Sequence, residues 1–238
     1  RGFSLLALAL ILSLYGAWMV NAKFGYGYAW LYGFYETEQH IANFGPKNRF
    51  RQGFETLSAE EHKKAFQQIV DSVHSNGEGL AEITYKFLGQ DIPLLHEAEK
   101  IHLRDVANLI NALHILVLLC LFTLITLYIW EYRHRCKSQD RASPLGLLGI
   151  FALLLILITA AFIVWGAKAI FYQMHIWVFP DHHQWFFYYQ DSLMSTLMKA
   201  PDLFAGITIQ IVLLGLIFYT AILLLMKRLL SGAVLKRS

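Results

Sequence analysis

Four long apolar runs constrain the fold of this chain more than any other feature. They occupy residues 1–22, 106–130, 145–170 and 204–226. Each has the length of roughly 20 residues that a helix needs to cross a hydrocarbon core about 30 Å thick. The 238-residue chain is 56% hydrophobic and only 16% charged, which exceeds the apolar content of an average soluble domain. We therefore expect an all-α integral membrane protein with four transmembrane helices.

The first run begins at a basic residue, Arg1, as a signal peptide would. It has no small-x-small cleavage pattern before Lys23, and it is long enough to span a bilayer. We expect it to remain in the protein as a transmembrane helix.

The distribution of Lys and Arg predicts the orientation of the chain. The link at 131–144 and the tail at 227–238 each carry four basic residues, and short basic loops stay on the cytoplasmic side. Both termini are therefore expected inside, and the segments 23–105 and 171–203 outside. The formal charge of +3 follows mainly from the basic link and tail, and no nucleic-acid partner is expected. The two cysteines, Cys120 in a span and Cys136 in the link, cannot cross-link the outer segments.

The first outer segment is expected to form a small and mainly helical cap before the chain enters the second span. Ser58 followed three residues later by Glu61 is the pattern of a capping box, which opens an amphipathic helix. His62 is expected to be solvated on that helix. A short strand is expected at 81–87.

Both outer segments are rich in aromatic residues, which are dense at 24–35 and again after the third span. Rings at such positions form either an interfacial belt or the wall of a groove for an acyl chain. Under the second interpretation the substrate-binding residues are Tyr26, Tyr28, Trp30, Tyr35, Phe171, Trp177, Phe179 and Trp185.

Two histidines, His102 and His175, lie within a few residues of the ends of apolar runs, and the expected topology puts both at the outer face of the membrane. Histidine is the only side chain whose unperturbed pKa lets it accept and return protons near neutral pH. If both serve one reaction centre, they lie about 4–10 Å apart. Asp105 follows His102 by three residues on the same helical face, so we expect it to orient the imidazole.

Other histidines are expected to be structural. His114 lies inside the second span and is expected to face the interior of the bundle. His182 and His183, beside Asp181, look like a pair of metal ligands. Adjacent residues of a helix diverge, however, and no third ligand stands at a suitable spacing. No metal is expected.

The ordered set of these residues resembles the bacterial lipoprotein intramolecular transacylases, known as Lit. The resemblance covers nearly the whole chain and is carried by three stretches, before the second span, after the third and before the fourth. The residues are Glu97, His102, Asp105 and Val106; Phe171, His175, Phe179 and Trp185; and Asp191, Leu193, Pro201 and Phe204.

The resemblance implies four transmembrane helices under an extracellular cap, in the bacterial cytoplasmic membrane. It implies that the sn-2 acyl chain of a diacylglyceryl-cysteine lipoprotein moves to the α-amino group of the same cysteine, which gives a lyso-form lipoprotein. The family's two catalytic histidines match His102 and His175, expected here as base and as acid or oxyanion partner. Supporting roles are expected for Glu97, Glu99, Asp105 and Asp191. The partners are the diacylated lipoprotein and membrane lipid, with no cofactor and a monomeric enzyme.

Two alternative functions come from other classes. A haem-binding electron carrier is compatible with ten histidines in a membrane protein, although only His114 lies clearly inside a span. A non-enzymatic membrane scaffold would use the aromatic residues for packing alone. The stretch 24–35 is richer in aromatic residues and glycine than the family pattern, so a relative with another acyl acceptor, such as a lysophospholipid or another amine, also stays open.

Overall fold

The structure, a computed structural model, describes residues 2–134, 164–200 and 202–235. Most of the predicted link at 131–144 and of the predicted third span at 145–170 lies outside the described residues, as does Cys136. The contacts between its residues in space divide the chain into two compact units. The first comprises residues 1–20, 114–172 and 211–238, and the second comprises residues 21–113 and 173–210.

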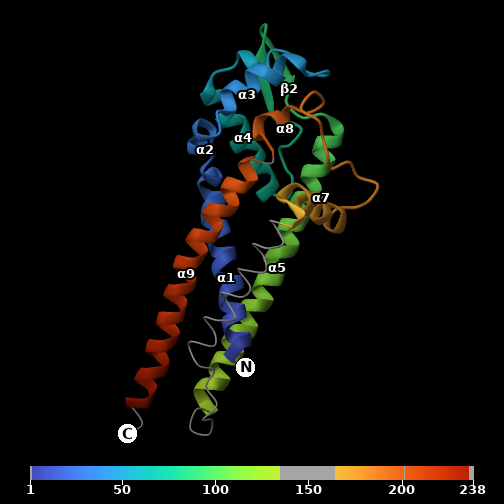
Figure 1. Cartoon of the computed structure of the whole chain (residues 1–238). Coiled ribbons are helices and arrows are strands. Elements are labelled where there is room, and N and C mark those ends of the chain that lie inside the picture. Colours follow the sequence, from blue (N-terminus) through green and yellow to red (C-terminus); the bar gives the residue numbers. More distant parts are fainter. Residues whose placement is uncertain (1, 135–163, 201, 236–238) are drawn as a thin grey trace. The chain divides into compact units, whose positions relative to one another are not determined.

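Three of the described helices are long and apolar enough to cross a membrane (Figure 1). They are α1 (Gly2–Lys23), α5 (Glu97–His134) and α9 (Asp202–Leu235). Their membrane-compatible stretches are Phe3–Lys23, Glu97–Glu131 and Asp202–Met226. The prediction of apolar helices is therefore confirmed for the first, second and fourth runs.

In the first unit, α1 and α9 pack through glycines. A Cβ on Gly215 of α9 would lie 2.7 Å from Leu14 Cδ2, and a Cβ on Gly16 of α1 would lie 3.4 Å from the Phe218 ring. Small residues let apolar helices approach closely in this way. His114 of α5 contacts the rings of Tyr15 and Trp18, with centroid distances of 5.9 and 6.1 Å. It therefore contacts α1, and its predicted position in the interior of a four-helix bundle stays a prediction.

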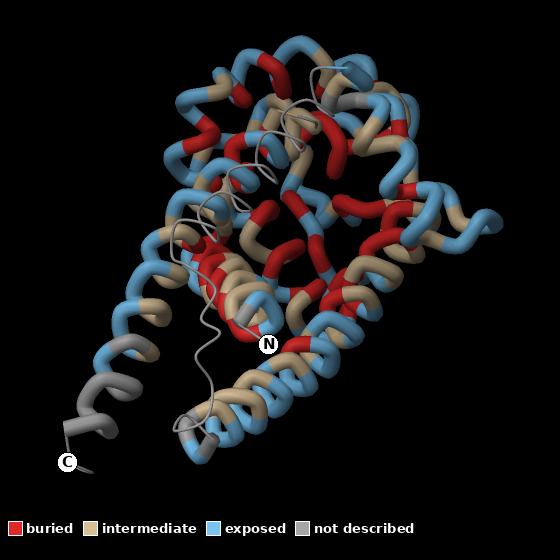
Figure 2. The backbone as a smooth tube through the Cα atoms, turned by 60° about the horizontal axis from the view of Figure 1, so that its bottom comes forward, coloured by how far each residue is buried: buried red, intermediate tan, exposed pale blue. Residues whose placement is uncertain are grey.

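The second unit contains the shorter elements and a buried core. After α1 come η1 (Gly25–Gly27), α2 (Tyr28–Phe34), α3 (Thr37–Phe44), η2 (Gly45–Lys47), η3 (Phe54–Thr56), α4 (Ala59–His74), β1 (Thr84–Phe87), β2 (Gln90–Pro93), the start of α5, the end of α7 (Ala167–Val178), α8 (Leu193–Met198) and the start of α9. Figure 2 shows the buried stretches in red. The largest fully buried apolar side chains of this unit are Phe54, Leu31, Ile41, Ile69, Leu94, Leu193 and Leu197.

The predicted capping box opens α4 and is confirmed. The Ser58 hydroxyl accepts a hydrogen bond from the Glu61 amide, and the Ser58 amide donates to the Glu61 carboxylate at 2.8 Å. The expectation that His62 is solvated was wrong, since it is 2% exposed. His62 lies on the same helical face as Phe66 and Ile69, which this helix buries.

The buried imidazole of His62 has a defined tautomer. Its Nε2 lies 2.9 Å from the carbonyl oxygen of Phe54, and its Nδ1 lies 2.8 Å from the Tyr32 hydroxyl. The carbonyl can only accept, so Nε2 carries the hydrogen and Nδ1 accepts from Tyr32. Protonation of this ring would reverse this bond, because Nδ1 would then donate to the Tyr32 hydroxyl oxygen.

The stability of this unit is expected to fall in mild acid. Burial lowers the pKa of His40 to about 4, with Lys199 acting in the same direction and Asp202 opposing it. Burial also lowers the pKa of His62. An unfolded histidine has a pKa of about 6.5, so the unfolded chain binds more protons than the folded one below that pH. This contribution to stability is present above about pH 6.5 and is lost as the pH falls towards 4.

Thermal unfolding of the detergent-solubilised protein at pH 7.5, 6.0 and 5.0 measures this dependence. The midpoint is expected to fall at each step. His40→Phe retains a ring against Phe44 and Tyr189 and is expected to weaken the pH dependence. A midpoint that is constant from pH 7.5 to 5.0 would contradict the assignment.

A hairpin of β1 and β2 replaces the single strand that the sequence predicted. The strands are antiparallel, with Phe87 opposite Gln90. The two turn residues, Leu88 and Gly89, have φ values of 49° and 78°, as a type I′ turn requires. This turn usually carries Asn or Asp at its first position. The exposed Leu88 in that position explains why the second strand was missed.

Gly53→Ala is expected to destabilise this unit by roughly 1–2 kcal/mol. Gly53 has φ of 80°, and an added Cβ would lie 2.0 Å from Phe87 Cδ2, so both the backbone and the hairpin would have to move. Gly33→Ala is the matched control, because nothing lies within 4 Å of a Cβ there. A lower unfolding midpoint for Gly53→Ala alone is the expected result, and equal midpoints would refute it.

Candidate active site

The second unit brings His102 and His175 together. His102 lies in the second turn of α5, and His175 lies in the last turn of α7. Their ring centroids are 6.3 Å apart, with an interplanar angle of 34°. Each residue is 8% exposed. The predicted separation of 4–10 Å is met, although the two residues are 73 positions apart in the sequence.

Aromatic rings surround this pair. Phe179 contacts both imidazoles, at 4.8 Å from His102 and 5.2 Å from His175. Trp185 lies 4.9 Å from His175, and Phe187 lies 6.0 Å from His102. Phe179 and Trp185 were expected near substrate, whereas Phe187 was not. Phe187 could have been predicted because it follows Trp185 by two residues, and residues two apart in an extended segment point to the same side.

One nitrogen of the pair is available for a ligand. His102 Nδ1 is buried and has no hydrogen-bond partner among the residues that the structure describes. Buried polar atoms are nearly always hydrogen-bonded, so a buried nitrogen without a partner at a candidate site indicates that a ligand atom binds there. A polar group of a bound substrate would satisfy it. The arrangement can therefore accept or deliver a proton, or stabilise an oxyanion, in a place lined by apolar rings.

Asp105 contacts a histidine that the sequence analysis treated as structural. Its Oδ2 lies 2.6 Å from His183 Nδ1. His183 lies in the segment between α7 and α8 and contacts the His182 ring at 4.3 Å. The expected hydrogen-bond partner of Asp105 was His102, one helical turn earlier.

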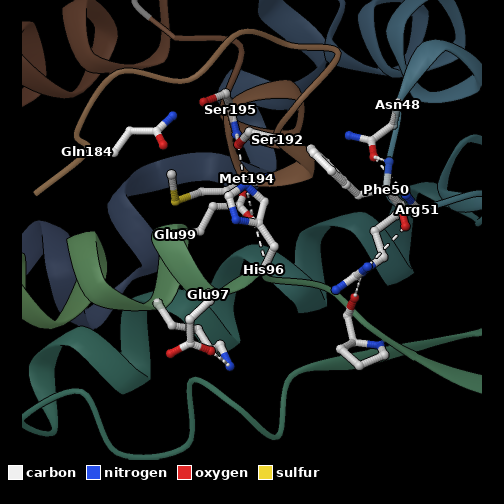
Figure 3. A network of polar contacts seen from close by, with 12 residues as sticks. Asn48, Phe50, Arg51, His96, Glu97, Glu99, Gln184, Ser192, Met194 and Ser195 are labelled. Atoms are coloured by element: carbon white, nitrogen blue, oxygen red, sulfur yellow. Dashed lines mark hydrogen bonds and ion pairs between the residues drawn. The ribbon is translucent and has the colours of Figure 1, made fainter.

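Glu99 joins the first turn of α5 to the start of α8 (Figure 3). Its Oε2 accepts from the His96 amide at 2.7 Å, as the third residue of a helix often caps the residue before the helix. Its Oε1 accepts from the Ser192 hydroxyl at 2.5 Å and from the Met194 amide at 3.3 Å. This carboxylate is 1% exposed. It holds the turn that precedes His102 against the segment that follows Phe187.

The other two predicted supporting carboxylates have different partners. Glu97 is 76% exposed and pairs with Lys100 at 2.6 Å. Asp191 pairs with Arg49 at 3.3 Å, and the Arg49 amide donates to the Gln190 carbonyl. Glu97 therefore lies at the surface, and Asp191 joins the segment before α8 to Arg49.

Three of the aromatic residues expected to bind substrate differ in burial. Tyr28 is buried, stacks on Phe66 with centroids 3.9 Å apart and donates to the Leu197 carbonyl. Trp30 and Trp177 are exposed. The sequence could not distinguish buried from exposed rings, because aromatic residues are dense throughout both outer segments.

The remaining three expected residues are Tyr26, Tyr35 and Phe171, and each has a contact of its own. The Tyr26 hydroxyl lies 2.8 Å from His74 Nε2. The Tyr35 carbonyl accepts from Lys199 Nζ. Phe171 belongs to the first unit, where its ring contacts Tyr172 at 6.3 Å.

Comparison with known proteins identifies the family to which this chain belongs. The family model described as lipoprotein intramolecular transacylase Lit matches residues 3–200. No curated protein and no solved structure matches the chain. The matched region contains both histidines and every element described above up to α8. The chain therefore belongs to the Lit family of lipoprotein intramolecular transacylases.

Proposed function

We propose that this protein moves the sn-2 acyl chain of a diacylglyceryl-cysteine lipoprotein to the α-amino group of the same cysteine. The observation that carries the proposal is the buried pair of His102 and His175, with centroids 6.3 Å apart among aromatic rings. Membership of the Lit family supports the class of reaction and of substrate.

The reaction needs two proton transfers at one carbonyl. The neutral α-amine attacks the ester carbonyl, and the nitrogen loses a proton as the C–N bond forms. The glyceryl oxygen gains a proton as the C–O bond breaks. In this proposal His102 accepts the first proton and His175 delivers the second, and each such transfer contributes typically 10²–10⁴-fold to a rate.

The chain does not need to supply a nucleophile, because the substrate carries its own. Phe179, Trp185 and Phe187 limit the access of water, which would otherwise hydrolyse the ester. The same rings hold the amine and the ester of one substrate molecule in a geometry that favours attack.

The membrane setting is part of the proposal. The apolar lengths of α1, α5 and α9 suit membrane-crossing helices. The basic residues after residue 130 and after residue 226 favour cytoplasmic ends for the second and fourth spans. We place the two termini in the cytoplasm and the histidine pair at the outer leaflet, where diacylated lipoproteins are anchored.

Expression in a bacterium whose lipoproteins are diacylated tests the proposal. Tandem mass spectrometry of the amino-terminal lipopeptides is expected to show an amide-linked acyl chain and a free glyceryl hydroxyl when the protein is present. The total mass is unchanged, because the reaction is an isomerisation. Lipopeptides that keep both ester chains and a free amine in the presence of the folded protein would count against it.

A further inference from the structure

A third histidine, His183, has the geometry of an oriented proton acceptor. Its Nδ1 lies 2.6 Å from Asp105 Oδ2, and the two side chains are 29% and 14% exposed. An ionised carboxylate only accepts hydrogen bonds, so Nδ1 carries the hydrogen in the neutral ring and Nε2 presents a lone pair.

The position of His183 is tied to the histidine pair from two directions. Asp105 follows His102 by one turn of α5, and residues three apart on a helix have Cβ atoms about 5–6 Å apart. The segment that carries His183 continues within four residues to Trp185 and Phe187, which contact His175 and His102. A turn closed by the His183 amide and the Pro180 carbonyl at 3.0 Å holds the residue in place.

The proposed reaction leaves one proton without an acceptor. The α-amino group of a peptide has a pKa near 8, so at pH 7 about nine in ten amines are ammonium ions that cannot attack an ester. The transfers assigned to His102 and His175 begin from the neutral amine. The proton of the ammonium ion has to leave before attack, either to water or to a group of the protein.

We propose that His183, oriented by Asp105, removes this proton from the substrate. The inference rests on the proposed transacylation. His183 Nε2 takes one proton from the ammonium ion, which gives a neutral amine and an imidazolium paired with Asp105. Attack on the ester then consumes the amine lone pair, the nitrogen passes its next proton to His102, and the leaving oxygen receives one from His175. His102 then returns its proton to His175, which restores the pair for the next turnover. Each turnover therefore releases one proton, which the partly exposed His183 passes to water.

Two titratable groups contact the side chain of His183 among the described residues. Asp105 faces it from α5, and His182 contacts it from its own segment. His182 is exposed and adjacent, which makes it a matched control for the loss of one imidazole. Asp105→Asn removes the carboxylate and keeps the shape of the side chain.

The test is the rate of acyl migration as a function of pH, with the purified full chain and a synthetic diacylglyceryl-cysteine peptide. His183→Gln and Asp105→Asn are expected to lower the rate by up to about tenfold at pH 7, a limit set by the one amine in ten that is neutral there without a base. The deficit is expected to shrink to less than about twofold at pH 9.5, where the amine is neutral without help. His182→Gln is expected to match the wild type at every pH.

A second substrate separates a chemical role from a structural one. A peptide analogue whose amino-terminal nitrogen is already neutral at pH 7 is expected to react at equal rates with the wild type and with His183→Gln. A deficit of His183→Gln that persists at high pH and with this analogue would overturn the inference, as would a rate equal to that of His182→Gln at pH 7. In both cases an active wild type would leave the proposed function standing. A wild type that forms no amide would overturn both proposals.

Discussion

Replacing His102 or His175 by alanine is expected to lower the rate of acyl migration by a factor of about 10²–10⁴. Each substitution removes one proton carrier from a pair whose centroids are 6.3 Å apart. The two residues serve one reaction centre in the proposal, so their effects are not additive. The double variant is expected to be little slower than the slower single variant.

Single-turnover kinetics with the synthetic lipopeptide measure this loss. Substrate binding is expected to change little, since the proposed proton transfers matter in the transition state and not in the bound ground state. His182→Gln controls for the removal of an exposed histidine from the same unit. Full activity of either alanine variant, with an unfolding midpoint like that of the wild type, would remove that histidine from the mechanism.

Glu99→Ala is expected to destabilise the protein by about 3–4 kcal/mol, the largest stability effect that we predict. The carboxylate accepts hydrogen bonds from the amides of His96 and Met194 and from the hydroxyl of Ser192. Each buried donor left without a partner costs roughly 1–3 kcal/mol. The variant is also expected to lose activity, because Glu99 holds the turn that precedes His102.

Glu97→Ala is the matched control for this prediction. Glu97 lies two residues away on the same helical turn but is 76% exposed and has one surface ion pair, with Lys100. Loss of such a pair costs about 0–1 kcal/mol. Thermal unfolding in detergent is expected to show a clear drop in midpoint for Glu99→Ala and almost none for Glu97→Ala. Equal midpoints for the two variants would refute the role of the buried carboxylate.

The sequence predicted the features that depend on local patterns. The apolar runs gave α1, α5 and α9 because length and hydropathy suffice to recognise such helices. The capping box before α4 was predicted because its two hydrogen bonds join residues three apart. The approach of His102 to His175 was predicted from two positions at the same ends of apolar runs, together with the family resemblance.

The features that depend on contacts between distant segments were not predicted. The burial of His62 requires Tyr32 and Phe54, which lie in other elements. The hydrogen bond of Asp105 to His183 joins residues 78 positions apart, and no local spacing distinguishes it from a bond to His102. The division of the aromatic stretch into the buried Tyr28 and the exposed Trp30 follows from how α2 packs on α4.

The measurement that tests the central claim most directly is a label-crossover experiment. Two diacylglyceryl-cysteine peptides of different sequence, one with deuterated acyl chains, are incubated together with the purified protein and analysed by tandem mass spectrometry. The account predicts that each peptide keeps its own acyl label and its total mass while one chain moves from the glyceryl ester to the α-nitrogen. Exchange of labels between the peptides, or loss of an acyl chain to water without amide formation, would contradict it.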